Sequence, residues 1–112
     1  MSDNPCLATI RGIPNRPDIG RINIRSGPGT NYDIPFKGTV GTSGLTITEV
    51  KVDNEGKNLD GKVYQWFKLN FPDGQVGWIR DDLLAIQGAC ASFGYDGAVQ
   101  ADSFAFALTR RG

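Results

Sequence analysis

The chain has 112 residues and a mass of 12.1 kDa, a length that allows one compact domain. Its 12 Lys and Arg residues balance 12 Asp and Glu residues, so it lacks the excess positive charge that suits a nucleic-acid or anionic-membrane partner. The absence of histidine excludes Ser-His and Cys-His nucleophile pairs and His-ligated metal sites. We therefore expect no enzymatic activity, no cofactor, no metal site and no nucleic-acid partner.

Fifteen glycines and six prolines punctuate short apolar stretches, a pattern typical of an all-β domain with many turns. No apolar run reaches the length of about 18 residues that a transmembrane helix needs, so we expect no membrane insertion. The first ten residues lack the basic start and the apolar core of a signal peptide. The protein is therefore either cytoplasmic, or extracytoplasmic after removal of a secretion signal.

Two cysteines, Cys6 and Cys90, flank the central part of the chain. With no histidine and no further cysteine nearby, they make a poor metal site. They either form a disulfide that ties the two ends of the domain together or remain two separate thiols. A disulfide over such a span would stabilise the fold by roughly 4–5 kcal/mol and would imply an oxidising compartment.

The N-terminal third contains one clear strand. Cys6–Ile10 is apolar and precedes a proline-rich stretch that cannot be helical, so we expect residues 1–19 to form an arm with a short edge strand. Ile22 and Ile24 alternate with polar residues and predict a strand with one buried face, which ends at the glycine-rich residues 26–29.

The next strand is predicted to contain an irregularity. Leu45–Thr48 alternates, but Val50 and Val52 take the opposite parity, which indicates a bulge near Glu49. Residues 53–61 are rich in turn formers and predict a long exposed hairpin loop.

The clearest strand spans Lys62–Phe71. Its apolar odd positions 67, 69 and 71 suit the core, which turns Tyr64 and Trp66 to the opposite face. Large aromatic side chains on an outer face need a reason, such as a ligand. Pro72–Gly74 predicts a tight turn into a partner strand at Gln75–Arg80.

The C-terminal part is less regular. Asp81–Leu84 predicts a 3₁₀ turn, followed by a last short strand at residues 85–86. After Gly88 the composition changes, and Ser103–Thr109 alternates in a way that favours an added strand and also fits a short helix. We therefore expect residues 88–112 to be a C-terminal extension.

Three motifs in order resemble those of bacterial SH3-like (SH3b) domains. Ile22–Tyr32, with the sequence I-N-I-R-S-G-P-G-T-N-Y, resembles their opening motif, Trp66–Leu69 resembles their W-Y-K-V strand, and Pro72–Ile79 resembles their hairpin ending in G-W-V. The match covers about residues 20–87. The resemblance implies an all-β fold, a small five-stranded SH3-like barrel with short flanking extensions. Because the ends of such a barrel lie close together, it also favours a disulfide between Cys6 and Cys90.

In that family the barrel usually serves as a targeting module attached to cell-wall hydrolases or surface proteins, with peptidoglycan, its stem peptides or other peptides as ligands. The candidate ligand-binding residues are Asn23, Arg25, Tyr32, Tyr64, Trp66 and Trp78. Asn23 and Arg25 face away from the core. There they either bind a peptide carboxylate or carbonyl, or form a salt bridge with Asp33 or Asp82 together with a side-chain bond to the turn. The aromatic residues either line a shallow groove or are covered by the flanking arms and belong to the core.

Acidic side chains give weaker signals. Adjacent Asp81 and Asp82 are typical of a helix start, where carboxylates accept backbone N–H bonds, rather than of a catalytic pair. Asp53, Asn54, Glu55 and Asp60 have oxygen ligands suited to calcium but lack the EF-hand spacing, so a solvated loop is favoured. We expect neither catalytic nor metal-binding residues.

These observations lead to two hypotheses. The first is a non-catalytic, extracytoplasmic or secreted module that recognises a cell-wall peptide or glycan, or a protein partner, within a larger parent protein. The second is a structural or assembly module, in which Leu7–Ile10 and Phe104–Phe106 pair as extra strands within the chain or with a neighbouring copy.

Overall fold

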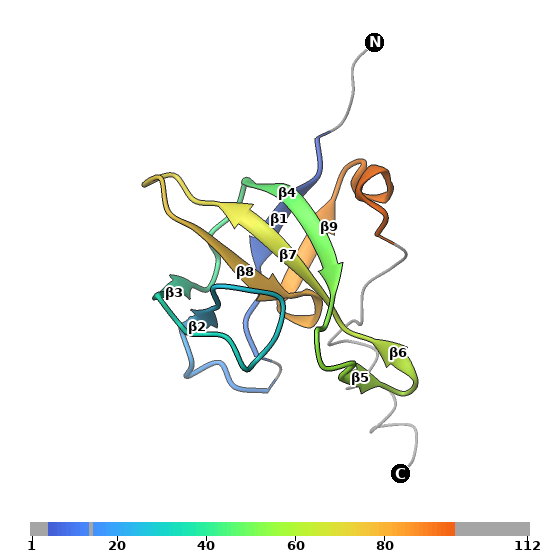
Figure 1. The fold of residues 1–112 in the computed structure, drawn as a ribbon. Helices are drawn as coiled ribbons and strands as arrows, with labels where there is room; N and C mark the ends of the chain where they lie inside the picture. Colours follow the sequence, from blue (N-terminus) through green and yellow to red (C-terminus); the bar gives the residue numbers. More distant parts are fainter. Residues whose placement is uncertain (1–4, 14, 96–112) are drawn as a thin grey trace.

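The computed structural model describes residues 5–13 and 15–95, which form an all-β fold (Figure 1). The main sheet is antiparallel, with the strand order β8-β7-β4-β1-β9. Its strands are β1 (Leu7–Ile10), β4 (Leu45–Val52), β7 (Gln65–Asn70), β8 (Val76–Arg80) and β9 (Leu84–Gln87). Two ribbons accompany it: β2 (Arg21–Ile24) with β3 (Phe36–Thr39), and β5 (Asn58–Leu59) with β6 (Lys62–Val63). The predicted all-β class is confirmed, and the main sheet has five antiparallel strands.

Backbone hydrogen bonds join the β2–β3 ribbon to the main sheet at two places. Arg25, which follows β2, exchanges N–H···O bonds of 2.9 and 2.8 Å with Trp78 in β8. Beyond β3, the N–H of Gly41 donates to the carbonyl of Ile10 (2.8 Å), and the N–H of Ile10 donates to Thr42 (2.9 Å). The ribbon is thus connected both to β8 and to the end of β1, so that the strands enclose one core.

Alternating apolar side chains fill this core as predicted. The largest fully buried apolar side chains are those of Phe67, Ile10, Ile24, Leu45, Ile47, Leu69, Ile79 and Leu84. Phe71 is only partly buried and packs edge-on against Phe36, with ring centroids 5.2 Å apart. The predicted core face of the central strand is therefore confirmed, with Phe71 at its margin.

The expectation of an edge strand at the N-terminus is wrong. Leu7–Ile10 pairs with β4 on one side and with β9 on the other. Ala8 and Ile10 are buried, and β9 comes from the opposite end of the chain to occupy the edge. We expected residues 1–19 to form an arm outside the barrel, but β1 lies in this segment and belongs to the main sheet. The assembly hypothesis left open whether Leu7–Ile10 pairs within the chain or with a neighbouring copy. In the structure this strand pairs within the chain on both of its sides.

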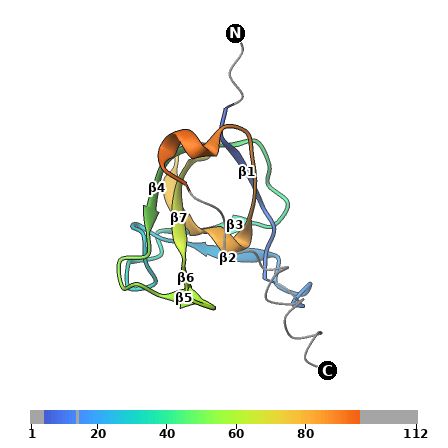
Figure 2. The same ribbon diagram turned by 90° about the vertical axis from the view of Figure 1, so that its right-hand side faces the viewer.

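The predicted strand over residues 62–71 is split in two. Its first part, β6, belongs to a hairpin with β5 that projects away from the main sheet (Figures 1 and 2). The break falls at Tyr64, whose N–H donates to Lys57 (2.9 Å) and whose carbonyl accepts from Asp53 (2.8 Å). These bonds hold the chain at the base of the hairpin. The exposed hairpin was predicted correctly, and so was the bulge, since the β4–β7 register shifts between Ile47 and Glu49.

The predicted turns are also present. Gly74 takes a positive φ of 89° in the reversal between β7 and β8, where the Asp73 carboxylate accepts a 3.0 Å bond from the N–H of Gln75. A 3₁₀ turn, η1 (Asp81–Leu83), starts with the two buried aspartates and leads into β9.

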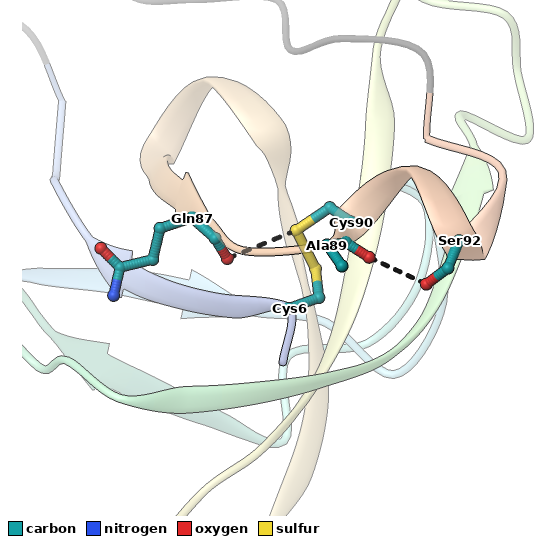
Figure 3. Close-up of a disulfide and its surroundings, with 5 residues drawn as sticks. All are labelled: Cys6, Gln87, Ala89, Cys90 and Ser92. Carbon is teal, nitrogen blue, oxygen red and sulfur yellow. Dashed lines mark hydrogen bonds between the residues drawn. A yellow bond between two sulfur atoms is a disulfide. The ribbon is translucent and has the colours of Figure 1, made fainter. Parts of the chain in front are cut away.

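Cys6 and Cys90 form the predicted disulfide (Figure 3). Cys90 begins a second 3₁₀ turn, η2 (Cys90–Phe93), in which the hydroxyl of Ser92 donates to the carbonyl of Ala89 (2.8 Å). The disulfide joins the residue before β1 to the segment after β9, with Cα atoms 4.7 Å apart. The predicted strand at Ser103–Thr109, including Phe104–Phe106, lies outside the described residues. The part of the chain that the structure describes contains no helix long and apolar enough to cross a membrane.

Candidate ligand-binding site

A pocket of about 350 Å³ lies where the β2–β3 ribbon meets β7 and β8. Its polar lining consists of Arg21, Asn23, Arg25, Thr30, Lys37 and Arg80. Its apolar lining consists of Ile13, Ile19, Ile22, Trp66 and Leu83. The pocket therefore combines four cationic side chains with an apolar surface, an arrangement suited to a small polar ligand or a short peptide segment.

The alternation of β2 places the polar residues at this pocket. Ile22 and Ile24 point into the core, so Arg21 and Asn23 share the opposite face. Lys37 in β3 stands directly opposite Asn23 in the antiparallel register and lies on the same face. The ribbon thus carries two cations and one amide on the surface that borders the pocket.

Arg25 is fixed by the loop that follows β2. Its Nη1 donates to the carbonyl oxygens of Thr30 (3.0 Å) and Tyr32 (3.1 Å). The expected side-chain bond to the turn is confirmed. The expected salt bridge is wrong, because within the described residues Arg25 pairs with neither Asp33 nor Asp82, and Asp82 binds Arg80. Since both acceptors of Arg25 are neutral carbonyls, its positive charge is not cancelled by them.

Arg80 forms a rigid part of the wall. Its Nε and Nη2 donate to the two carboxylate oxygens of Asp82 (2.7 and 2.9 Å), and its guanidinium lies 4.2 Å from the ring centroid of Tyr64. Burial acts to lower the pKa of Arg80, but the hydrogen bond and the charge of Asp82 leave it raised. The pKa of Tyr64 is raised chiefly by burial, with a partial opposing effect of Arg80.

Trp66 borders the pocket from the side of the sheet but is not an exposed aromatic surface. Its side chain is directed away from the face that carries Phe67, as predicted, yet Trp66 is only 3% exposed. Its Nε1 donates a 2.8 Å hydrogen bond to Oδ2 of Asp53, which is also 3% exposed. The expectation that Trp66 lines a shallow, open groove is therefore wrong. The base of the β5–β6 hairpin covers part of the indole.

The other three aromatic candidates do not line this pocket. Trp78 is buried and contributes its backbone to the bridge with Arg25. The ring of Tyr32 lies so close to Gly27 that a side chain added at Gly27 would overlap it. Tyr64 stacks on the guanidinium of Arg80. The structure thus brings together three of the six predicted residues, namely Asn23, Arg25 and Trp66.

Sequence reasoning missed three cationic lining residues. Arg21 could have been found, because the alternation of β2 places it on the same face as Asn23. Lys37 and Arg80 reach the pocket through pairing with distant parts of the chain, which local patterns do not encode.

Asp53, one of the acidic residues considered as a calcium ligand, forms hydrogen bonds within the protein. Oδ1 of Asp53 accepts bonds from the N–H groups of Glu55 (2.9 Å) and Lys57 (3.3 Å), while Oδ2 binds Trp66. Among the described residues, no group of three or more Cys, Asp or Glu side chains is arranged to hold a metal ion. Asp53 therefore organises the hairpin and the indole.

A second depression, of about 570 Å³, lies beside the β5–β6 hairpin. It is lined by Val52, Asp60, Gly61, Lys62, Val63 and Gln65. None of the predicted binding residues borders it, and its charged lining side chains, Asp60 and Lys62, have opposite signs. The pocket beside the β2–β3 ribbon is therefore the stronger candidate.

Comparison with known proteins shows that part of the chain is similar to a segment of a kinase-named protein. No family model and no solved structure matches it. It is 38% identical over 78 residues to a protein named serine/threonine-protein kinase D from Synechocystis sp.. The match covers 69% of this chain and 13% of that protein, so the chain spans a small part of the length of its relative. This match corrects the expectation of a protein without enzymatic activity, since it relates the chain to a segment of a named kinase. The resemblance to bacterial SH3-like domains stays a prediction.

Proposed function

We propose that this chain is a peptide-binding module of a protein related to serine/threonine kinases, and that its ligand is a bacterial cell-wall peptide. One observation carries the proposal: Asn23 and Arg25 from the opening motif and Trp66 from a second motif converge on one pocket. Hydrogen-bonding groups beside an apolar wall are what a peptide needs, because its backbone is polar and its side chains are partly apolar.

Hydrogen bonds within the protein hold three of the side chains that line the pocket. Arg25 is held by two carbonyl oxygens, Arg80 by Asp82, and the Trp66 indole by Asp53. Fixed side chains lose little conformational entropy on binding, so more of the interaction energy contributes to affinity. Asn23 is exposed in β2 and has both a donor and an acceptor for a peptide backbone.

The kinase match and the disulfide support the proposal that the module belongs to a longer, extracytoplasmic protein. A segment that covers 13% of a kinase-named relative suits a ligand-binding part of a longer chain. The Cys6–Cys90 disulfide is typical of an oxidising environment, so we propose an extracytoplasmic location for the module. The bound peptide would then localise the parent protein or report the state of the wall to it.

Co-sedimentation with purified bacterial cell-wall sacculi tests the proposal. We expect wild-type protein to pellet with sacculi and Asn23→Ala to bind several-fold more weakly. Asn70→Ala is the matched control, because Asn70 is also an exposed strand asparagine but does not line the pocket. A wild-type protein that stays in the supernatant at tens of micromolar would refute a cell-wall ligand. Equal binding by both variants would refute this pocket as the site.

A further inference from the structure

The pocket concentrates positive charge in a chain that is neutral overall. The charges of the chain balance, yet the pocket is lined by four cations, and none of its lining residues is acidic. Asp82 offsets one of these charges through its bidentate bond to Arg80. The remaining three leave a positive potential that favours an anionic ligand group.

Arg21 and Lys37 are the two cations available to a ligand. Both are exposed, and within the described residues neither forms an ion pair. Arg21 precedes Asn23 by two residues on one face of β2, and Lys37 stands opposite Asn23 in β3. Diagonal neighbours of this kind lie about 7–8 Å apart, within reach of one carboxylate for side chains of this length.

The proximity of Arg21 and Lys37 has an electrostatic cost, which an anionic ligand would reduce. Like charges close together on one sheet face repel each other. A carboxylate between them replaces that repulsion with two charge-assisted hydrogen bonds, which are among the strongest that proteins form.

We infer that the pocket selects peptides by a free carboxylate, which Arg21 and Lys37 bind together while Asn23 pairs with the adjoining peptide group. This inference rests on the proposed function and adds the chemical class of the ligand. Arg25, held through its Nη1, and Arg80, held through its Nε and Nη2, contribute positive potential and shape. A carboxylate is the anionic group that a peptide ligand supplies. The inference therefore predicts that removing the negative charge of the ligand weakens binding.

The test compares native sacculi with sacculi whose carboxylates have been converted to methylamides. We expect wild-type protein to bind the amidated sacculi about tenfold more weakly. The double variant Arg21→Gln/Lys37→Gln should bind native sacculi about tenfold more weakly than wild type and lose little more on amidated sacculi. Glutamine keeps hydrogen-bond donors but removes the charge, and both positions are exposed, so the fold should be retained.

Lys51→Gln/Lys68→Gln is the matched control, because it removes the same net charge outside the pocket. It should bind native sacculi like wild type. If it loses as much binding as the pocket variant, the attraction is non-specific and the inference is wrong. Equal wild-type binding to native and amidated sacculi would overturn the inference and leave the proposed function standing. No wild-type binding to native sacculi would remove the proposed function and the inference with it.

Discussion

The indole Nε1 of Trp66 donates a 2.8 Å hydrogen bond to Oδ2 of Asp53, 13 positions earlier in the chain, and both residues are buried. The same carboxylate accepts two backbone N–H groups of the following turn through Oδ1. One acidic side chain therefore closes the base of the β5–β6 hairpin and holds one wall of the pocket. This relationship explains why an aspartate in a polar, turn-rich loop is buried.

Replacing Asp53 should therefore destabilise the fold. Asp53→Ala leaves the buried Nε1 of Trp66 and the N–H groups of the turn without their acceptor, and we expect a loss of roughly 2–4 kcal/mol in the free energy of unfolding. Urea denaturation followed by tryptophan fluorescence measures this loss. Glu55→Ala, an exposed change in the same loop, should alter stability by less than about 0.5 kcal/mol. Similar losses in the two variants would contradict the structural role of the Asp53 carboxylate.

The disulfide between Cys6 and Cys90 should contribute strongly to stability, because it closes a loop over a sequence separation of 84. By the loop-entropy relation, Cys6→Ser/Cys90→Ser should lower the free energy of unfolding by roughly 4–5 kcal/mol. Urea unfolding with and without dithiothreitol measures the effect in wild type. The double variant is the control and should not respond to the reductant. If wild type unfolds at the same urea concentration in both conditions, the predicted contribution is wrong.

Local alternation predicted which side chains point inward. Ile22, Ile24, Phe67 and Leu69 are buried as expected, because successive strand residues face opposite sides and this period is visible in a short window. The bulge before Glu49 was visible for the same reason, as a change of parity. The fold class and the strand faces therefore followed from the sequence.

Long-range pairing was not predictable in this way. Leu7 pairs with both Thr46 and Gln87, so the place of β1 inside the sheet depends on partners far along the chain. The burial of Trp66 likewise depends on Asp53, which no local pattern connects to it. Sequence reasoning therefore found the polar face of β2 in the candidate site but overestimated the exposure of the aromatic wall.

Stability at alkaline pH should depend on Tyr64. Burial raises its pKa above the usual value, so the folded state holds the phenolic proton more tightly than the unfolded chain. The contribution is fully present below pH about 10 and is lost as pH rises through the folded pKa, because ionisation then favours unfolding. Tyr64→Phe should therefore flatten the decline of the urea midpoint above pH 10, roughly where tyrosine ionises. The two proteins should show parallel behaviour near neutral pH. An equally steep alkaline decline in the variant would contradict the effect of burial.

Gly77 in β8 should tolerate no side chain, because the β2 segment packs closely against it. A Cβ added there would overlap Cγ2 of Ile24 and lie 3.4 Å from Cε1 of Phe36. We expect Gly77→Ala to lower the free energy of unfolding by about 1–3 kcal/mol, as overpacked cores do, measured by urea denaturation. Gly20→Ala is the matched control, since nothing lies within 4 Å of its added Cβ, and it should be neutral or stabilising by up to about 1 kcal/mol. If both variants were as stable as wild type, β2 and β8 could not pack this closely.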